Sequence, residues 1–228
     1  MYFPFVFDWT ILLIIPGIIV AIWAQSKISR TYKTYSKIPV QSGITGADTA
    51  RKLLLSAGLH HVDVTATTGR LTDYYNPRKK YVALSQENFS RSSIAAVAVA
   101  AHECGHAMQH GKGYLPLKIR TLMAPVVSAA SYLLWPILIL GIIFEVTNTI
   151  EIAVYIFAGI FVFQMVTLPV EFNASKRAIA ALSEQGILEE EEVYGAKKML
   201  QAAALTYVAA TLVALLNVIR FATISRRR

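Results

Sequence analysis

Four apolar stretches without a charged side chain constrain this chain more than any other feature. They cover residues 9–24, 122–144, 152–170 and 202–219. A helix needs about 20 apolar residues to cross a bilayer; the second stretch exceeds this length, the third and fourth come near it, and the first is short unless residues 3–7 extend it. The hydrophobic share of 55% and the mean hydropathy of +0.47 also exceed what one soluble core of 228 residues needs. We therefore expect a mostly α-helical membrane protein with about four transmembrane helices.

Basic residues predict the orientation of these helices. Lys27, Arg30 and Lys33 follow the first stretch, whereas only Asp8 precedes it, so the region after it is expected in the cytoplasm. The N-terminus lacks the positive region of a secretory signal, which favours an uncleaved anchor. The connection 145–151 has no basic residue and is expected outside. Four complete spans would also put the three C-terminal arginines outside, although basic residues are usually in excess on the cytoplasmic side. Either the last helix is re-entrant or laterally packed, or the tail is an exception to this bias.

The net charge of +8 indicates an anionic partner. Most basic residues flank the apolar stretches, which favours lipid head groups of the bilayer and argues against nucleic acid. A separate basic run at 78–80 follows Asn76 and Pro77 and fits a solvated turn. The sequence does not predict an oligomeric state.

The segment His102-Glu103-Cys104-Gly105-His106 is the second strong feature. At 3.6 residues per turn, the two histidines lie on one helix face, so their ring nitrogens can bind one Zn²⁺. Glu103 can then act as general base toward a metal-activated water. This HExxH pattern is typical of zinc-dependent peptidases.

An amphipathic helix that carries the same pattern by chance is the alternative. The Ala-rich lead-in at 92–101 and the later Gly111 and Gly113 place the motif inside an apolar helix. Ionisable side chains in a buried helix are costly without a metal or partners, which favours a metal site. Cys104, the only cysteine of the chain, points away from His102 on the helix, so we expect it to pack as a small residue.

A catalytic zinc usually has three protein ligands, so a third must come from elsewhere. His110 continues the spacing, but it lies about 12 Å from His102 along a straight helix, too far to share the metal. Glu171 is the favoured ligand, because the short loop between the second and third stretches returns the chain to the membrane face that it left. An interfacial charge without a ligand role is the alternative for Glu171. Glu184 and Asp73 are weaker ligand candidates.

The residues around the expected ligands suggest further roles. Ser175 lies one turn beyond Glu171 and is expected to orient that carboxylate or a histidine ring, whereas Asn173 is less well placed. The acidic run 189–192 is expected to be a solvated turn, since four consecutive carboxylates radiate around a helix. Candidates for an oxyanion donor, by residue type alone, are Tyr74, Tyr75 and Arg177.

The polar region 25–121 predicts a small α+β domain around the motif helix, similar to a zincin. Thr45 and Gly58 bound a helix over 46–57, residues 62–67 alternate as a strand, and 71–75 and 81–84 are expected to form a hairpin. A strand beside the motif helix could bind an extended peptide, although it could equally serve only to cover that helix. The expected divisions are an N-terminal membrane anchor (1–24), a cytoplasmic zinc-binding region (25–121), a transmembrane helical hairpin (122–170), a third-ligand segment with a cytoplasmic loop (171–200), and a C-terminal membrane helix with a basic tail (201–228).

Several segments resemble the YugP-type family of bacterial membrane zinc metallopeptidases. They are LTDYYNPR at 71–78, VALS at 82–85, SIAAVAVAAHECGHAMQ at 93–109 and EFNASKRA at 171–178. The resemblance extends over most of the chain, and it implies a membrane-embedded peptidase with His102, His106 and Glu171 on zinc and Glu103 as catalytic base. The chain is more distantly similar to HtpX-type membrane proteases, which commonly have Asp at the position of Ser175.

The expected function is therefore zinc-dependent endopeptidase activity on a peptide or protein substrate associated with the membrane. The expected location is the bacterial cell membrane, with several spans and the active site on the cytoplasmic side. Quality control of membrane proteins is a hypothesis by analogy. A non-catalytic zinc-binding membrane adaptor or scaffold is the alternative, against which the presence of Glu103 argues. A transporter is disfavoured because the apolar stretches contain no charge.

Overall fold

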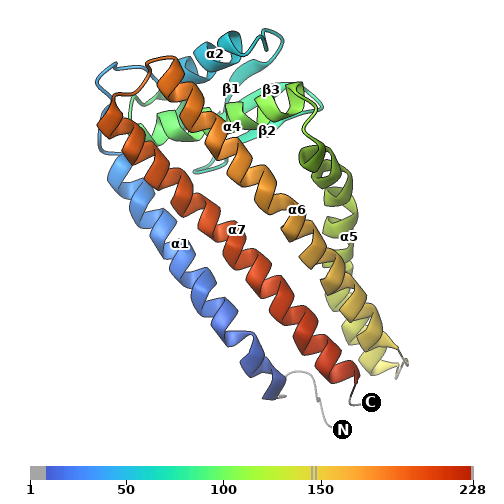
Figure 1. Cartoon of the computed structure of the whole chain (residues 1–228). Coiled ribbons are helices and arrows are strands. Elements are labelled where there is room, and N and C mark those ends of the chain that lie inside the picture. Colours follow the sequence, from blue (N-terminus) through green and yellow to red (C-terminus); the bar gives the residue numbers. More distant parts are fainter. Residues whose placement is uncertain (1–8, 145, 147, 227–228) are drawn as a thin grey trace. The chain divides into compact units, whose positions relative to one another are not determined.

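The computed structural model describes residues 9–144, 146 and 148–226, and most of them are helical (Figure 1). Predictions that concern the other positions, such as an extension of the first stretch by residues 3–7 and the last two arginines of the tail, lie outside the described residues. In chain order the elements are η1 (Trp9–Leu13), α1 (Ile15–Tyr35), α2 (Gly46–Ser56), β1 (Asp63–Thr67), β2 (Tyr74–Asn76), β3 (Tyr81–Ser85), α3 (Gln86–Ser90), α4 (Ile94–Gly111), α5 (Leu115–Ile143), α6 (Thr149–Glu184) and α7 (Glu190–Ser225).

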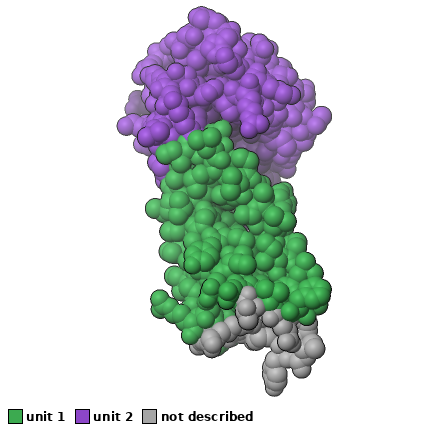
Figure 2. Space-filling view, turned by 90° about the vertical axis from the view of Figure 1, so that its right-hand side faces the viewer, with its two compact units in different colours: residues 1–25, 119–168, 206–228 green, residues 26–118, 169–205 purple. Residues whose placement is uncertain are grey.

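The chain divides into two compact units (Figure 2). Unit 1 comprises residues 1–25, 119–168 and 206–228, and unit 2 comprises residues 26–118 and 169–205. Helices α1, α5, α6 and α7 each contribute to both units. Every residue that the sequence singles out as a metal ligand or catalytic base belongs to unit 2.

Apolar helix segments build unit 1. Leu138 of α5 packs with Ile150 and Ala153 of α6 and with Phe221 of α7. The ring of Phe157 stacks on that of Phe221 at a centroid distance of 4.8 Å. Large apolar side chains also remain exposed on these helices, as expected for surfaces that face lipid. They include Ile18, Ile22, Leu133, Ile139, Ile152 and Tyr155.

Within the described residues, four helices are long and apolar enough to cross a membrane, as the sequence predicts. They are Trp9–Tyr35, Leu115–Gly141, Thr149–Glu184 and Glu190–Ser225. These helices are longer than the apolar stretches, because tertiary packing in unit 2 continues the helical hydrogen bonding into polar sequence. Helix α7 has no break, which argues against a re-entrant final segment.

Unit 2 contains a three-stranded sheet, in the part of the chain that the structure describes, with strand order β1-β3-β2. Strand β3 pairs in parallel with β1, where Val82 lies opposite Val64, and antiparallel with β2, where Val82 lies opposite Tyr75. The predicted hairpin is therefore confirmed, but its first strand begins later than expected, at Tyr74. Leu71 has φ = 55° and Gly69 has φ = 98°, and neither value is compatible with an extended strand.

Helix α2 has the start and end that its sequence predicts. The Thr45 hydroxyl oxygen accepts a hydrogen bond from the Asp48 N–H at 3.1 Å, and Gly58 adopts the left-handed φ of 72° that often follows a helix end. The helix packs against α4, where the buried Cys104 thiol donates to the Ala50 carbonyl at 3.6 Å. Cys104 is thus the packed small residue that its position on the helix predicts.

The acidic run 189–192 is exposed at Glu189, Glu190 and Glu191, as predicted, but it is not a turn, and the prediction was wrong for Glu192. Glu190 begins α7, and Glu192 is buried. Its carboxylate accepts hydrogen bonds from the N–H of Glu189 at 2.9 Å and from the N–H of Gln41 at 2.7 Å. The first contact is half of a capping box, and the helix dipole favours negative charge at this end. The run of four acidic residues gives no local sign that one of them, Glu192, accepts hydrogen bonds from two backbone N–H groups.

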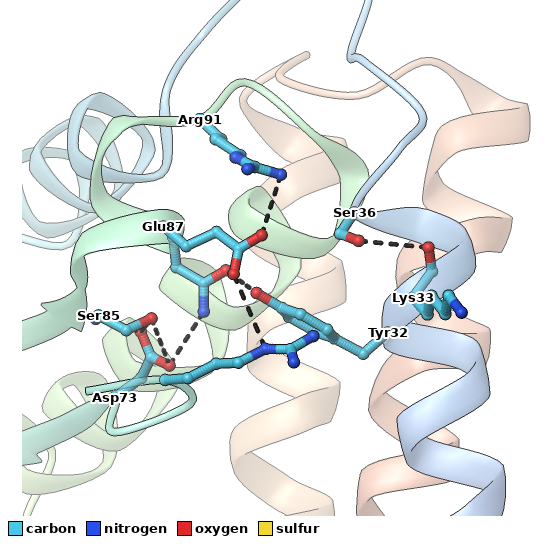
Figure 3. A network of polar contacts seen from close by, with 9 residues as sticks. Tyr32, Lys33, Ser36, Asp73, Ser85, Glu87 and Arg91 are labelled. Atoms are coloured by element: carbon cyan, nitrogen blue, oxygen red, sulfur yellow. Dashed lines mark hydrogen bonds and ion pairs between the residues drawn. The ribbon is translucent and has the colours of Figure 1, made fainter.

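A network of polar contacts joins α1 to the sheet in unit 2 (Figure 3). The Tyr32 hydroxyl donates to Asn88 at 2.9 Å, and the Asn88 amide donates to the Asp73 carboxylate at 2.9 Å. The Ser85 N–H donates to the same carboxylate at 2.7 Å. Burial raises the pKa of Asp73, although these hydrogen bonds oppose that shift. Asp73 directly precedes β2, and these contacts hold it against Ser85 of β3 and Asn88 of α3.

Candidate metal centre

Helix α4 carries the HExxH motif through unit 2. The Ser93 hydroxyl caps its start by accepting from the Ala96 N–H at 3.3 Å, and Gly113 follows its end with φ = 63°. Small residues between these ends are fully buried and allow neighbouring elements to approach closely. The rings of His102 and His106 lie on one face, with centroids 4.8 Å apart.

Glu171 of α6 completes a cluster with these two histidines. Its Oε2 lies 3.2 Å from Nε2 of His102 and 3.6 Å from Nε2 of His106. The side chain of Glu171 is only 2% exposed. Among the described residues, these three offer ligand atoms that all lie within 4.8 Å of one another. The structure thus brings together the three residues that the sequence predicts as metal ligands.

Gly105 allows α4 and α6 to meet at this point. A Cβ atom on Gly105 would collide with the backbone carbonyl of Ala174, and a backbone group cannot move aside as a flexible side chain can. The helices therefore cross between the two histidines of the motif. Because Ala174 lies one turn after Glu171, this crossing brings the Glu171 carboxylate to the imidazoles.

The three side chains fit a zinc ion. Two imidazole nitrogens and one carboxylate oxygen form a donor set that is common in catalytic zinc sites. Tetrahedral zinc with bonds of about 2.0–2.1 Å separates neighbouring ligand atoms by about 3.3 Å. The observed distances of 3.2 and 3.6 Å between Glu171 and the two rings lie close to this value. These residues could therefore hold zinc with little rearrangement.

Glu103 and Cys104 lie inside the motif and have different surroundings. Glu103 is 9% exposed, and burial raises the pKa of its carboxyl, while interaction with His102 and His106 opposes that shift. A carboxylate that burial destabilises is a stronger base than one in water. Burial also raises the pKa of the Cys104 thiol, which is then a poor metal ligand.

Each histidine has a further polar contact at Nδ1, the ring nitrogen on the side away from Glu171. Nδ1 of His102 lies 3.2 Å from the Ser175 hydroxyl, so Ser175 is beside a histidine ring as its spacing predicts. Nδ1 of His106 lies 3.0 Å from Oε1 of Gln109. The sequence did not single out Gln109, although its spacing of three residues from His106 puts both on one helix face.

The other residues with suggested roles make different contacts. His110 lies outside the cluster, with Nδ1 2.9 Å from the Tyr75 hydroxyl, in agreement with the distance argument from the sequence. Asp73 contacts Ser85 and Asn88 instead, and Glu184 lines a separate surface groove. These two weaker ligand candidates are thus not brought to the histidines.

The three oxyanion candidates also have polar partners. The Tyr74 hydroxyl lies 2.8 Å from that of Tyr81, and the Arg177 guanidinium donates to Asn173 at 2.7 Å. Tyr75 contacts the motif helix through His110. An oxyanion role for any of them stays a prediction.

Comparison with known families gives a match over residues 10–226, nearly the whole chain. The family is described as "Putative neutral zinc metallopeptidase". The chain belongs to this family. Membership in a zinc metallopeptidase family agrees with the donor set of His102, His106 and Glu171.

A relative of this chain in Bacillus subtilis strain 168 is described as "Putative membrane protease YugP". The two sequences are 43% identical over 215 residues, which cover 94% of this chain and 95% of the relative. The resemblance to the YugP-type family inferred from the sequence is therefore confirmed. The description of the relative as a membrane protease agrees with the four membrane-length helices found within the described residues. No solved structure matches the chain.

Proposed function

We propose that this chain is a membrane-embedded zinc endopeptidase with a zincin-like catalytic unit. In this proposal His102, His106 and Glu171 hold the zinc. The observation that carries it is geometric: two ring nitrogens, one helical turn apart, face the same carboxylate oxygen at 3.2 and 3.6 Å. Membership in a zinc metallopeptidase family supports both the metal and the class of reaction.

Glu103 is the proposed general base. Zinc, when bound in such a site, polarises the peptide carbonyl and makes water nucleophilic at neutral pH. Glu103 accepts a proton from the attacking water and returns it to the leaving amine. Its burial beside the two histidines supports this role, because burial disfavours the charged carboxylate and makes it more ready to take a proton.

Strand β2 is the proposed docking edge for an extended peptide. It is an outer strand of the sheet, with β3 on one side only among the described residues. It also lies against the motif helix, where the Tyr75 hydroxyl contacts His110. An edge strand offers backbone donors and acceptors to a peptide of any sequence, as an endopeptidase requires.

The active site is proposed to lie on the cytoplasmic side of a bacterial cell membrane. The basic residues 27–37 that follow the first apolar stretch support this orientation. A Lys79→Cys variant tests it, because Lys79 is exposed in the turn before β3 and Cys104, the only native cysteine, is buried. A membrane-impermeant maleimide should label intact cells poorly and permeabilised cells strongly. Equal labelling of both would contradict the orientation.

Cleavage of casein by the detergent-purified chain and its Glu103→Gln variant tests the reaction. Loss of the base should lower the rate about 10²- to 10⁴-fold and leave zinc near one per chain. Glu87→Gln is a matched control, since Glu87 on the short helix α3 pairs with Arg91, the residue that follows this helix. Full activity of Glu103→Gln would contradict the proposed base. Wild type that holds zinc but cleaves no substrate would favour the adaptor.

Quality control of membrane proteins is the proposed cellular role, by analogy with other membrane proteases. Inactivation by Glu103→Gln in cells should slow the turnover of damaged membrane proteins under stress. Unchanged turnover of every membrane protein measured would contradict this role.

A further inference from the structure

Gln109 is buried one turn beyond the motif and touches both helices of the proposed zinc site. It is 0% exposed. Its Nε2 lies 2.7 Å from the Val170 carbonyl, immediately before Glu171, and 3.1 Å from Oδ1 of Asn173. Its Oε1 lies 3.0 Å from Nδ1 of His106. One amide thus links a histidine of α4 to the backbone that carries the carboxylate of α6.

The surrounding groups fix the direction of this amide. A backbone carbonyl can only accept a hydrogen bond, so the atom facing Val170 must be the nitrogen of Gln109. The second contact agrees, because Oδ1 of Asn173 also accepts from the guanidinium of Arg177, which has only donors. The oxygen of Gln109 must then face His106.

The direction of the amide in turn fixes the form of the His106 ring. An amide oxygen has no hydrogen to donate, so the contact with Nδ1 requires that Nδ1 carries the hydrogen. In a neutral imidazole the other nitrogen, Nε2, then holds the lone pair. Nε2 is the atom that faces Glu171 at 3.6 Å.

We propose that Gln109 is a positioning residue that holds His106 in the tautomer and orientation needed to bind zinc, while it ties α6 to α4 at Glu171. This inference rests on the proposed zinc site. The corresponding contact at His102 constrains that ring less, because the Ser175 hydroxyl can either donate or accept and therefore does not select a tautomer. Partners behind a metal-bound histidine commonly set metal affinity in this way.

The first test is the zinc affinity of the full chain in detergent, measured by competition with a chromophoric chelator. Gln109→Met keeps the side-chain length without its hydrogen bonds and should weaken zinc binding roughly 10- to 100-fold. Asn173→Ala removes one of the two groups that orient the amide and should have a smaller effect in the same direction. Asn88→Leu is the matched control, a buried amide with two side-chain hydrogen bonds that should leave zinc affinity unchanged.

The second test uses the wild type and does not depend on the folding of a variant. Nitrogen NMR of the metal-free chain, labelled with ¹⁵N-histidine, should find the hydrogen of His106 on Nδ1. Two results would overturn the role of Gln109 alone if the wild type binds zinc and cleaves casein. One is hydrogen on Nε2 of His106 with none on Nδ1, and the other is unchanged zinc affinity in folded Gln109→Met. A wild type that binds no zinc would overturn the proposed function and this inference together.

Discussion

Different contacts hold the two parts of helix α6. Residues 149–168 pack in unit 1 through apolar side chains such as Phe157, which stacks on a ring of α7. Residues 169–184 in unit 2 add polar contacts to α4, including those of Glu171 and Ser175 with one histidine. One continuous helix thus serves an apolar core and a polar site in succession.

This difference predicts separate consequences of substitution. Apolar burial is non-directional and depends on area, whereas hydrogen bonds and metal ligands require particular atoms at particular places. Changes in the first part of α6 should lower stability and spare the metal. Changes in the second part should affect the metal first, and pairs of variants on the same helix can separate the two effects.

Removal of the proposed third ligand should have the largest effect. Glu171→Ala leaves two histidine ligands and should reduce zinc from about one per chain to well below half, as measured by mass spectrometry of dialysed protein. Ile150→Ala on the same helix is the contrast, because it should destabilise the chain by about 2–5 kcal/mol without loss of zinc. Full zinc in Glu171→Ala would remove this carboxylate from the site.

Two glycines should respond in opposite directions to the same substitution. Gly105→Ala places a methyl group against the Ala174 backbone and should destabilise the protein by about 1–3 kcal/mol. Gly159→Ala in the first part of α6 meets nothing within 4 Å and should be neutral or stabilise by up to about 1 kcal/mol. Thermal melting in detergent measures both. Equal melting temperatures would show that the crossing of α4 and α6 is not tight.

Ser175→Ala should have a moderate effect on zinc affinity. Loss of one hydrogen bond to His102, worth about 0.5–1.5 kcal/mol, corresponds to roughly a 2- to 12-fold weaker affinity. Ser131→Ala is the control, since its hydroxyl donates only to the carbonyl of Val127 within α5. A larger loss of zinc affinity in Ser175→Ala than in Gln109→Met would contradict the stronger role given to Gln109.

The pH dependence contributed by Asp73 should be the smallest of these effects. Burial raises its pKa in the folded state, so its contribution to stability is fully present below the unfolded pKa and is lost as pH rises through the folded pKa. Wild type should therefore gain stability relative to Asp73→Asn as pH falls from neutral, in denaturant titrations. The exposed Asp63→Asn serves as the control, and a gain in the opposite direction would contradict the shift.

Local sequence was sufficient for the features that depend on neighbours along the chain. The spacing of His102 and His106 places both rings on one face, and Thr45 and Gly58 mark the ends of α2. Glu171 could be predicted as a ligand from the path of the chain, because the short loop between the second and third apolar stretches returns the chain to the membrane face that it left. Its role as a zinc ligand stays a proposal, although the structure brings it to the histidines.

Other features depend on partners that are distant in the sequence. Gln109 gains its proposed role only from Val170 and Asn173 of another helix, which no local pattern shows. The burial of Glu192 requires Gln41, and the extension of α6 beyond its apolar stretch requires packing in unit 2. Hydropathy marks where lipid can surround a helix, but it does not mark where the helix ends.

X-ray absorption at the zinc edge on the detergent-purified wild type tests the central claim most directly. We expect scattering from two imidazoles and from oxygen at about 2.0–2.2 Å, with no sulfur neighbour. Glu171→Ala should change the oxygen signal and preserve the imidazole signal in any zinc that remains. A sulfur neighbour at about 2.3 Å, as from Cys104, or a single imidazole would contradict a site built from His102, His106 and Glu171.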